Sequence, residues 1–122
     1  FEAIYALGHG LYSQQKFDEA ERHFGLLALY RPTEPRYLRA IAACRQRAGR
    51  HEEAIQTWSL LAFLAPEDPD PSLHVAECQI RLGQRAEAAA SLRMVVRLCE
   101  LAGVQGPIRV RALALAAQLE KQ

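Results

Sequence analysis

Hydrophobic positions along the chain recur at the intervals of amphipathic α-helices. Within each segment apolar residues return every three or four positions, as a single buried helix face requires. Glycine, proline and short polar runs separate the segments. The pattern predicts an all-α chain with helices at about 2–14, 17–30, 36–48, 51–64, 71–82, 85–102 and 107–121.

The helical segments repeat with a period of 34 residues. Ala20, Ala54 and Ala88 share this spacing, as do Pro32 and Pro66. A period of 34 residues with two helices is typical of the tetratricopeptide repeat, whose helix pairs stack into a solenoid with a concave face. We therefore expect one domain, 1–122. Its parts are repeats at about 1–34, 35–68 and 69–102, followed by a helix that caps the last repeat.

Some fixed positions of the repeat carry small residues, and another carries a bulky residue in every copy. Gly8 and Ala20 are small, as are their equivalents in the later repeats, and this predicts close approach of the two helices of a pair. Phe24, Trp58 and Leu92 share one repeat position and are expected to fill the space between adjacent repeats.

Charge and composition argue against two kinds of function, nucleic-acid binding and membrane insertion. The net charge of +1 gives no sign of a nucleic-acid partner. No apolar run is long enough to cross a membrane, so direct membrane insertion is not expected. Because the chain begins at Phe1 inside a predicted helix and without Met, we expect a further segment upstream of it.

The sequence offers no catalytic or metal-binding motif. Three cysteines without paired spacing favour a reducing compartment, and Cys44 and Cys78 read as buried core thiols. The four histidines are scattered, with no spacing typical of zinc ligands, and no glycine-rich phosphate loop is present. We expect no cofactor, no metal and no enzymatic activity.

The first helix of each repeat is expected to line the concave face. Residues two, five, nine, twelve and thirteen of a repeat share one side of that helix. This side mixes aromatic, aliphatic and charged groups, which suits a peptide groove. The predicted peptide-binding residues are Tyr5, His9, Tyr12, Arg39, Ala43, Gln46, Leu73, Glu77 and Ile80.

Two short strings go beyond the general repeat pattern. They are Ala-Cys-Arg-Gln at 43–46 and Ala-Glu-Cys at 76–78. With Phe-Asp-Glu-Ala at 17–20, they give a chain that resembles the tetratricopeptide chaperones of bacterial type III secretion systems that serve the pore-forming translocators. The resemblance implies a protein of the bacterial cytoplasm that keeps hydrophobic translocator proteins soluble and ready for export.

The same resemblance implies that an extended client segment binds in the concave groove, with its apolar anchors in pockets. It also implies a possible homodimer through a region that precedes the first repeat. Two alternatives stay open: a needle-subunit co-chaperone of the same secretion system, and a regulatory scaffold that binds a transcriptional regulator.

Overall fold

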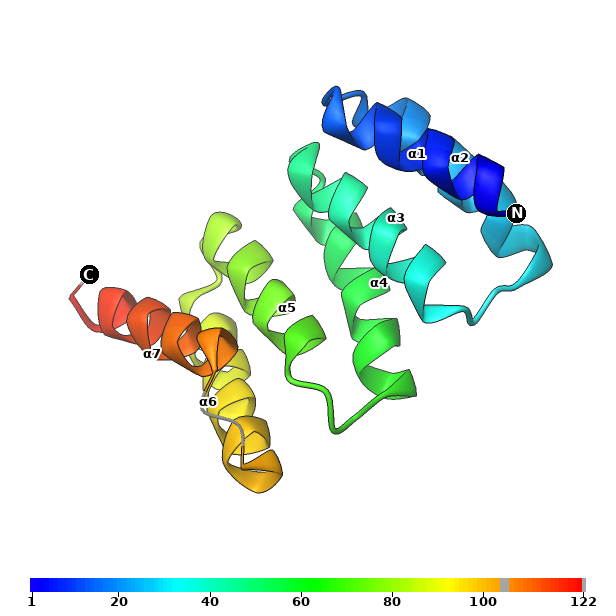
Figure 1. Cartoon of the computed structure of the whole chain (residues 1–122). Helices are drawn as coiled ribbons and strands as arrows, with labels where there is room; N and C mark the ends of the chain where they lie inside the picture. The colour runs from blue at the N-terminus through cyan, green and yellow to red at the C-terminus, as the bar shows by residue number, and fades with distance from the viewer. Residues whose placement is uncertain (104–105, 122) are drawn as a thin grey trace. The chain divides into compact units, whose positions relative to one another are not determined.

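The computed structural model of the chain consists of helices joined by short turns (Figure 1). It describes residues 1–103 and 106–121. The helices in this part of the chain are α1 (Glu2–Ser13), α2 (Phe17–Tyr30), α3 (Pro35–Arg47), α4 (His51–Leu64), α5 (Asp70–Arg81), α6 (Arg85–Ala102) and α7 (Pro107–Glu120).

These helices confirm the all-α tetratricopeptide-type fold that the sequence predicts. Each begins and ends within one residue of its predicted position, and the described residues include no strand. Positions 104–105 of the predicted break before α7 lie outside the described residues. In the part of the chain that the structure describes, no helix has the length and apolar character needed to cross a membrane.

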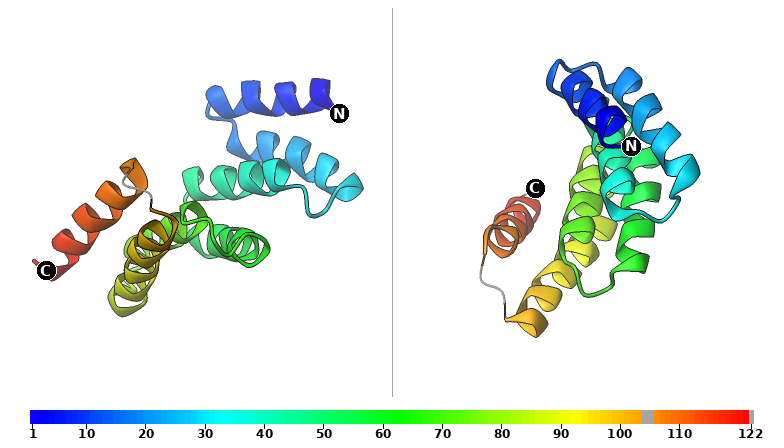
Figure 2. Two further views of the ribbon diagram at one scale, coloured as in Figure 1. Left: turned by 60° about the horizontal axis from the view of Figure 1, so that its bottom comes forward. Right: turned by 45° about the vertical axis from the view of Figure 1, so that its right-hand side comes forward.

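The chain divides into two compact units within α4. Unit 1 is Phe1–Thr57 and unit 2 is Trp58–Gln122. In unit 1, α2 packs against both α1 and α3, and in unit 2, α6 packs against α5 and α7 (Figures 1 and 2).

The core of unit 1 is built around the buried ring of Phe24. Leu27, Tyr37 and Cys44 are buried with it, so α2 and α3 supply most of this cluster. The apolar residues of α1, including Tyr5 and Tyr12, pack against the cluster and stay partly exposed. One face of α1 is therefore shared between the core and the surface.

Gly8 allows α1 to come close to α2. A Cβ atom at this position would lie 2.7 Å from Cε1 of Phe24 and 2.8 Å from Cζ. Gly8 and Phe24 are both buried, and a fully packed ring has little room to move aside. The contact confirms that Gly8 marks a close approach, as its place in the repeat predicts.

The turn inside each helix pair uses a residue in the left-handed region. Gln15, Gly49 and Gly83 are 34 residues apart and have φ values of 63°, 84° and 75°. After each of them, a backbone N–H returns to a carbonyl near the end of the preceding helix. These hydrogen bonds run from Lys16 to Leu11, Arg50 to Arg45 and Gln84 to Gln79. Such bonds end a helix by satisfying its last carbonyls.

The seventh helix completes the core of unit 2. Ala112, Leu115 and Leu119 are buried against α5 and α6, together with Leu92 and Val95. This agrees with the predicted role of the helix as a cap on the last repeat, since it covers apolar residues that the last helix pair alone would expose.

The cysteines are free and buried, as predicted for Cys44 and Cys78. Burial, together with the nearby carboxylate of Glu21, raises the pKa of Cys44 to about 11. Burial, together with Glu77, raises the pKa of Cys78 to about 11 as well. Both thiols are therefore protonated at neutral pH and poor nucleophiles.

The close approach at Gly8 predicts that a larger residue at this position destabilises the fold. We expect Gly8→Ala to lower the free energy of unfolding by about 1–3 kcal/mol, because the added methyl group overlaps Phe24. Gly10→Ala is the matched control, since no atom lies within 4 Å of its Cβ position and alanine favours the helix by about 1 kcal/mol. Urea unfolding of both variants checks this, and equal effects of the two substitutions would contradict it.

Candidate functional site

A hollow of about 320 Å³ lies between α1 and α3 in unit 1, above the ring of Phe24. We call it the unit 1 pocket. Tyrosine, histidine, arginine, alanine and proline side chains form its walls. The lining residues are Tyr5, His9, Tyr12, Phe24, Pro35, Arg36, Arg39, Ala40 and Ala43.

Aromatic rings in edge contact form one wall of the pocket. The ring centroid of Tyr5 lies 4.5 Å from that of His9 and 5.7 Å from that of Phe24. His9 in turn lies 5.3 Å from Phe24. Such edge-to-face pairs hold each ring in place, so the wall is formed before any ligand arrives.

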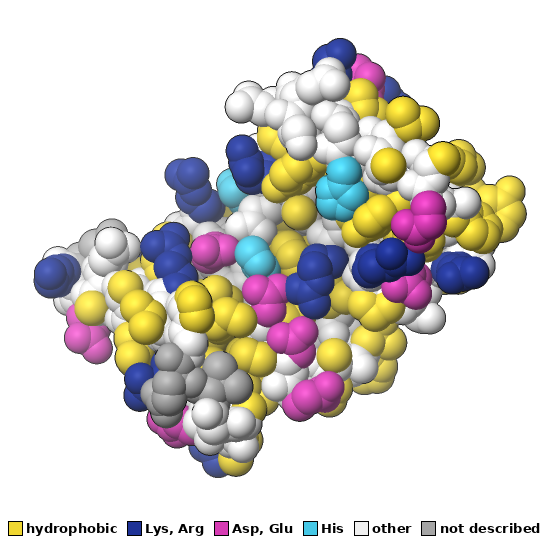
Figure 3. Space-filling view, in the orientation of Figure 1, with side chains coloured by type: hydrophobic (Ala, Val, Ile, Leu, Met, Phe, Trp, Pro, Cys, Tyr) yellow, Lys and Arg dark blue, Asp and Glu magenta, His cyan; other side chains and the backbone are white. Residues whose placement is uncertain are grey.

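Arginines of α3 lie on the faces of these rings. The guanidinium of Arg36 is 5.1 Å from the ring centroid of Tyr5, and that of Arg47 is 5.7 Å from the centroid of Tyr12. Arg36 also pairs with Glu2 and Glu34, each at 3.4 Å. Around this part of the molecule, hydrophobic side chains lie among basic side chains, acidic side chains and histidine (Figure 3).

The pocket brings together the predicted residues of unit 1, with one exception. Tyr5, His9, Tyr12, Arg39 and Ala43 all line it. Gln46 is half-buried one turn further along α3 and is not among the lining residues.

The prediction missed four lining residues of the pocket: Phe24, Pro35, Arg36 and Ala40. Phe24 lies on the second helix of the repeat, and only the small residue opposite it, Gly8, hints in the sequence that its ring reaches this face. Arg36 occupies position two of its repeat, on the helix face that the sequence predicts to be concave, although it is not among the predicted peptide-binding residues.

The predicted peptide-binding residues of unit 2 lie at the core or in ion pairs. Leu73 is buried, with 6% of its surface exposed, and Ile80 packs against the same core cluster. Glu77 forms ion pairs on both sides: its carboxylate lies 3.0 Å from Nδ1 of His74 and 3.5 Å from Nε of Arg111 on α7.

His74 is the centre of this charged cluster. Its ring stacks on the indole of Trp58 with a centroid distance of 4.1 Å and an angle of 11° between the planes. Nε2 lies 3.4 Å from a carboxylate oxygen of Asp70. Burial of the ring lowers the pKa of His74, but its hydrogen bonds to Asp70 and Glu77 outweigh burial and raise the pKa to about 9.

The sequence profile of the tetratricopeptide repeat family matches residues 1–33. No curated protein matches the chain significantly. Among solved structures, PcrH in complex with the chaperone binding region of PopB is 31% identical, with a TM-score of 0.74, and the match covers 98% of this chain and 91% of that one. The chain belongs to the tetratricopeptide chaperones of type III secretion.

Other members of the family are similar over the same length. PcrH from Pseudomonas aeruginosa is 29% identical, with a TM-score of 0.84, and the match covers 98% of this chain and 90% of that one. The SycD chaperone of Yersinia enterocolitica, solved with a peptide of the translocator YopD, is 25% identical with a TM-score of 0.86 and coverages of 98% and 91%.

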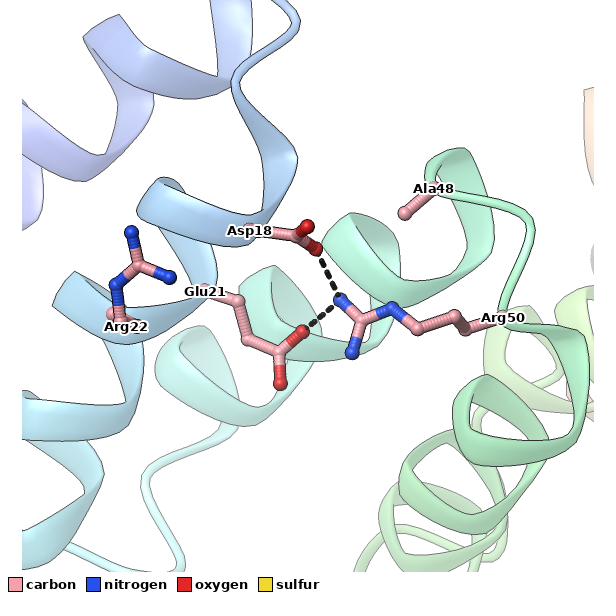
Figure 4. A pocket seen from close by; sticks show the side chains of 5 residues that line it. All are labelled: Asp18, Glu21, Arg22, Ala48 and Arg50. Atoms are coloured by element: carbon pink, nitrogen blue, oxygen red, sulfur yellow. Dashed lines mark hydrogen bonds and ion pairs between the residues drawn. The ribbon is translucent and has the colours of Figure 1, made fainter.

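This chaperone has a second hollow in unit 1 that is better explained as a structural network. It has a volume of about 430 Å³ and is lined by Asp18, Glu21, Arg22, Ala48 and Arg50 (Figure 4). Arg50 pairs with Glu21 and, at 3.1 Å, with Asp18.

The carboxylate of Glu21 also accepts a hydrogen bond from a second arginine, Arg45. Nε of Arg45 lies 3.1 Å from its carboxylate, and the same guanidinium donates to Thr57 at 2.8 Å. These bonds connect α2, α3 and α4, and they engage Asp18, Glu21 and Arg50, three of the five residues that line the hollow. Within the described residues no group of histidine, cysteine and carboxylate side chains could hold a metal ion.

The raised pKa of His74 predicts how stability changes with pH. The charged ring stabilises the folded chaperone fully below its ordinary pKa of 6.5, and this contribution is lost as pH rises through about 9. We expect the free energy of unfolding to fall by about 1–3 kcal/mol between these values, after allowing for the partial exposure of the ring. Urea unfolding at several pH values measures this.

The variant His74→Gln should remove this pH dependence, because glutamine does not titrate. Asp70→Asn is the companion variant, since it removes one of the two carboxylates and should lower the His74 pKa in an NMR titration of the ring. A slope that persists unchanged in His74→Gln would assign the effect to other groups.

Proposed function

We propose that this chaperone acts in the bacterial cytoplasm, where it binds an extended segment of hydrophobic translocator proteins and keeps them soluble and ready for export. The proposal is based on the unit 1 pocket. It is an open, aromatic-walled hollow with cations at its edge, in a chain whose relatives include PcrH solved with the chaperone binding regions of PopD and PopB.

The size and walls of the pocket suit an apolar side chain of a peptide. Its volume of about 320 Å³ is at the low end of the range of about 300–1,000 Å³ for ligand pockets. Tyr5, Tyr12 and Phe24 offer apolar ring surface, and the side chains of Arg36 and Arg39 give the same hollow a polar part.

Burial of such an anchor explains how the chaperone would keep its client soluble. An exposed apolar segment of a translocator would associate with other chains, and a pocket that covers its anchors removes this surface from water. The rings are held by mutual contacts, so little order has to be imposed when the client binds.

The predicted peptide-binding residues of unit 2 have less direct roles in the proposal. Glu77 presents a carboxylate that is already paired, and Leu73 and Ile80 would contribute through the shape of α5 rather than as open anchor sites. Homodimerisation stays a prediction, as do the needle-subunit and regulatory alternatives.

The pocket can be tested with the chaperone binding region of PopD as a labelled probe. We expect the double variant Tyr5→Ala with Tyr12→Ala to weaken binding at least about tenfold, because buried aromatic anchors dominate the energy of such contacts. Tyr30→Ala is the control, since Tyr30 is exposed on α2 and does not line the pocket. Fluorescence anisotropy gives the affinities, and circular dichroism verifies the fold of each variant. Equal affinities for wild type and the double variant would remove the pocket from the mechanism.

A further inference from the structure

Helix α7 is apolar on two opposite sides. Ala112, Leu115 and Leu119 form the inner side, which is buried in the core of unit 2. The side turned away from this core carries four exposed apolar residues, which we call the α7 outer stripe: Val110, Leu113, Ala114 and Ala117. They follow the i, i+3, i+4, i+7 spacing of a single helix face. Because a helix that is apolar all round is typically covered all round, the outer stripe has the character of an interface.

The apolar surface continues from α7 onto α6. A hollow of about 580 Å³ lies between the two helices, and Leu113 lines it from α7 while Met94 and Val96 line it from α6. Met94 is 51% exposed and Leu113 is 43% exposed. The remaining lining residues are Ala90, Leu92, Arg93, Arg97, Glu100 and Ala116. A further helix that packs along the outer stripe would also cover the apolar part of this hollow.

One edge of the outer stripe carries a charge at each end. Arg109 lies near the N-terminal end of α7 and Glu120 at its C-terminal end, three helical turns away, so both project from the same edge about 16 Å apart. Among the described residues neither forms an ion pair, and Nε of Arg109 is covered without a hydrogen-bond partner. On the other edge, Arg111 pairs with Glu77 and Gln118 is neutral. The two unpaired charges are therefore on one edge and opposite in sign.

A second copy of the chain has the surface that complements this arrangement. In a two-fold symmetric pair of antiparallel helices, each edge of one helix faces the same edge of the other, so Arg109 of each copy faces Glu120 of the other copy. The ion pair then forms twice, and the positive end of each helix lies beside the negative end of the other. The two-fold axis passes beside Ala114, at the middle of the stripe, where a small residue lets the backbones approach closely.

We propose that the α7 outer stripe is the interface of a homodimer, in which the α7 helices of two chains pack antiparallel with Ala114 at the centre and ion pairs between Arg109 and Glu120 at both ends. This interface differs from the one expected before the first repeat, and it does not depend on the proposed client. A helix pair about 21 Å long buries less surface than a standard interface, so we expect a Kd on the order of 10–100 µM.

Charge reversal tests the ion pairs. Arg109→Glu and Glu120→Arg each place like charges opposite one another at both ends, and we expect each to raise the Kd of the dimer at least about tenfold in a sedimentation-velocity concentration series. Each variant puts at its end of α7 the charge that the helix dipole favours, so a lost dimer would not reflect a weakened helix. Arg22→Glu is the matched control, because it makes the same charge change on α2, and it should leave the Kd unchanged.

A mixture of the two reversed variants separates a specific ion pair from general repulsion. Positions 109 and 120 are both acidic in Arg109→Glu and both basic in Glu120→Arg, so a mixed dimer has opposite charges at both ends. We expect the equimolar mixture to dimerise within about threefold of the wild-type Kd, although neither variant does so alone. The chain that carries both substitutions should dimerise like the wild type, since the ion pair is then restored in reverse.

Single cysteines test the direction and the centre of the helix pair. Ala114→Cys places a thiol beside the two-fold axis, so mild oxidation should join two chains by a disulfide. Ala117→Cys is the matched control on the same stripe: antiparallel packing sets its two copies about 10 Å apart along the helices, beyond the reach of about 7 Å that a disulfide allows between Cα atoms. The native cysteines are buried and leave the readout on a non-reducing gel unaffected.

The other possible occupants of the stripe give different results. A chain that stays monomeric up to about 0.5 mM would overturn the proposal, because the stripe would then be covered by a helix of another protein or by no partner. A dimer that both reversed variants retain would overturn it as well, since the contact would then lie elsewhere. Equal cross-linking through positions 114 and 117 would contradict the antiparallel pair.

Discussion

The contact between the Phe24 ring and the backbone at Gly8 is the constraint on which the candidate site depends. The ring belongs to the core of unit 1 and also forms the floor of the pocket. Because Gly8 has no side chain, α1 lies close enough for Tyr5 and His9 to meet the edge of the same ring. Core packing and pocket shape are therefore set by one close approach, and a change at either residue would affect both.

Ring contacts place the charged groups of the site as well. Tyr5 and Tyr12 lie against the core on one side and against arginines of α3 on the other, so apolar packing orients the cations at the pocket edge. Unit 2 uses similar chemistry for another purpose. There the stack of Trp58 on His74 and the ion pairs of Glu77 join α4, α5 and α7. These rings and this carboxylate hold the helices of unit 2 together.

The repeat period predicted the helices closely because each boundary has a local cause, such as a left-handed turn residue at Gly49 and Gly83. The site was harder to predict because its lining residues come from α1, α2 and α3, and the pattern along one helix does not show which faces meet. Tyr5, Arg39 and Leu73 occupy the same repeat position, yet the first two line a pocket and Leu73 is buried among residues that include Leu115. The cluster around His74 needs partners from α4 and α7, which no spacing within α5 could reveal.

The central claim is that a translocator segment lies extended against Tyr5 and Tyr12. Isotope-edited NMR of the labelled PopD region bound to the unlabelled chaperone tests it most directly. We expect contacts between aliphatic side chains of the segment and both tyrosine rings, with extended-backbone chemical shifts at the contact residues. A bound segment that is helical, or one with no contact to either ring, would contradict it.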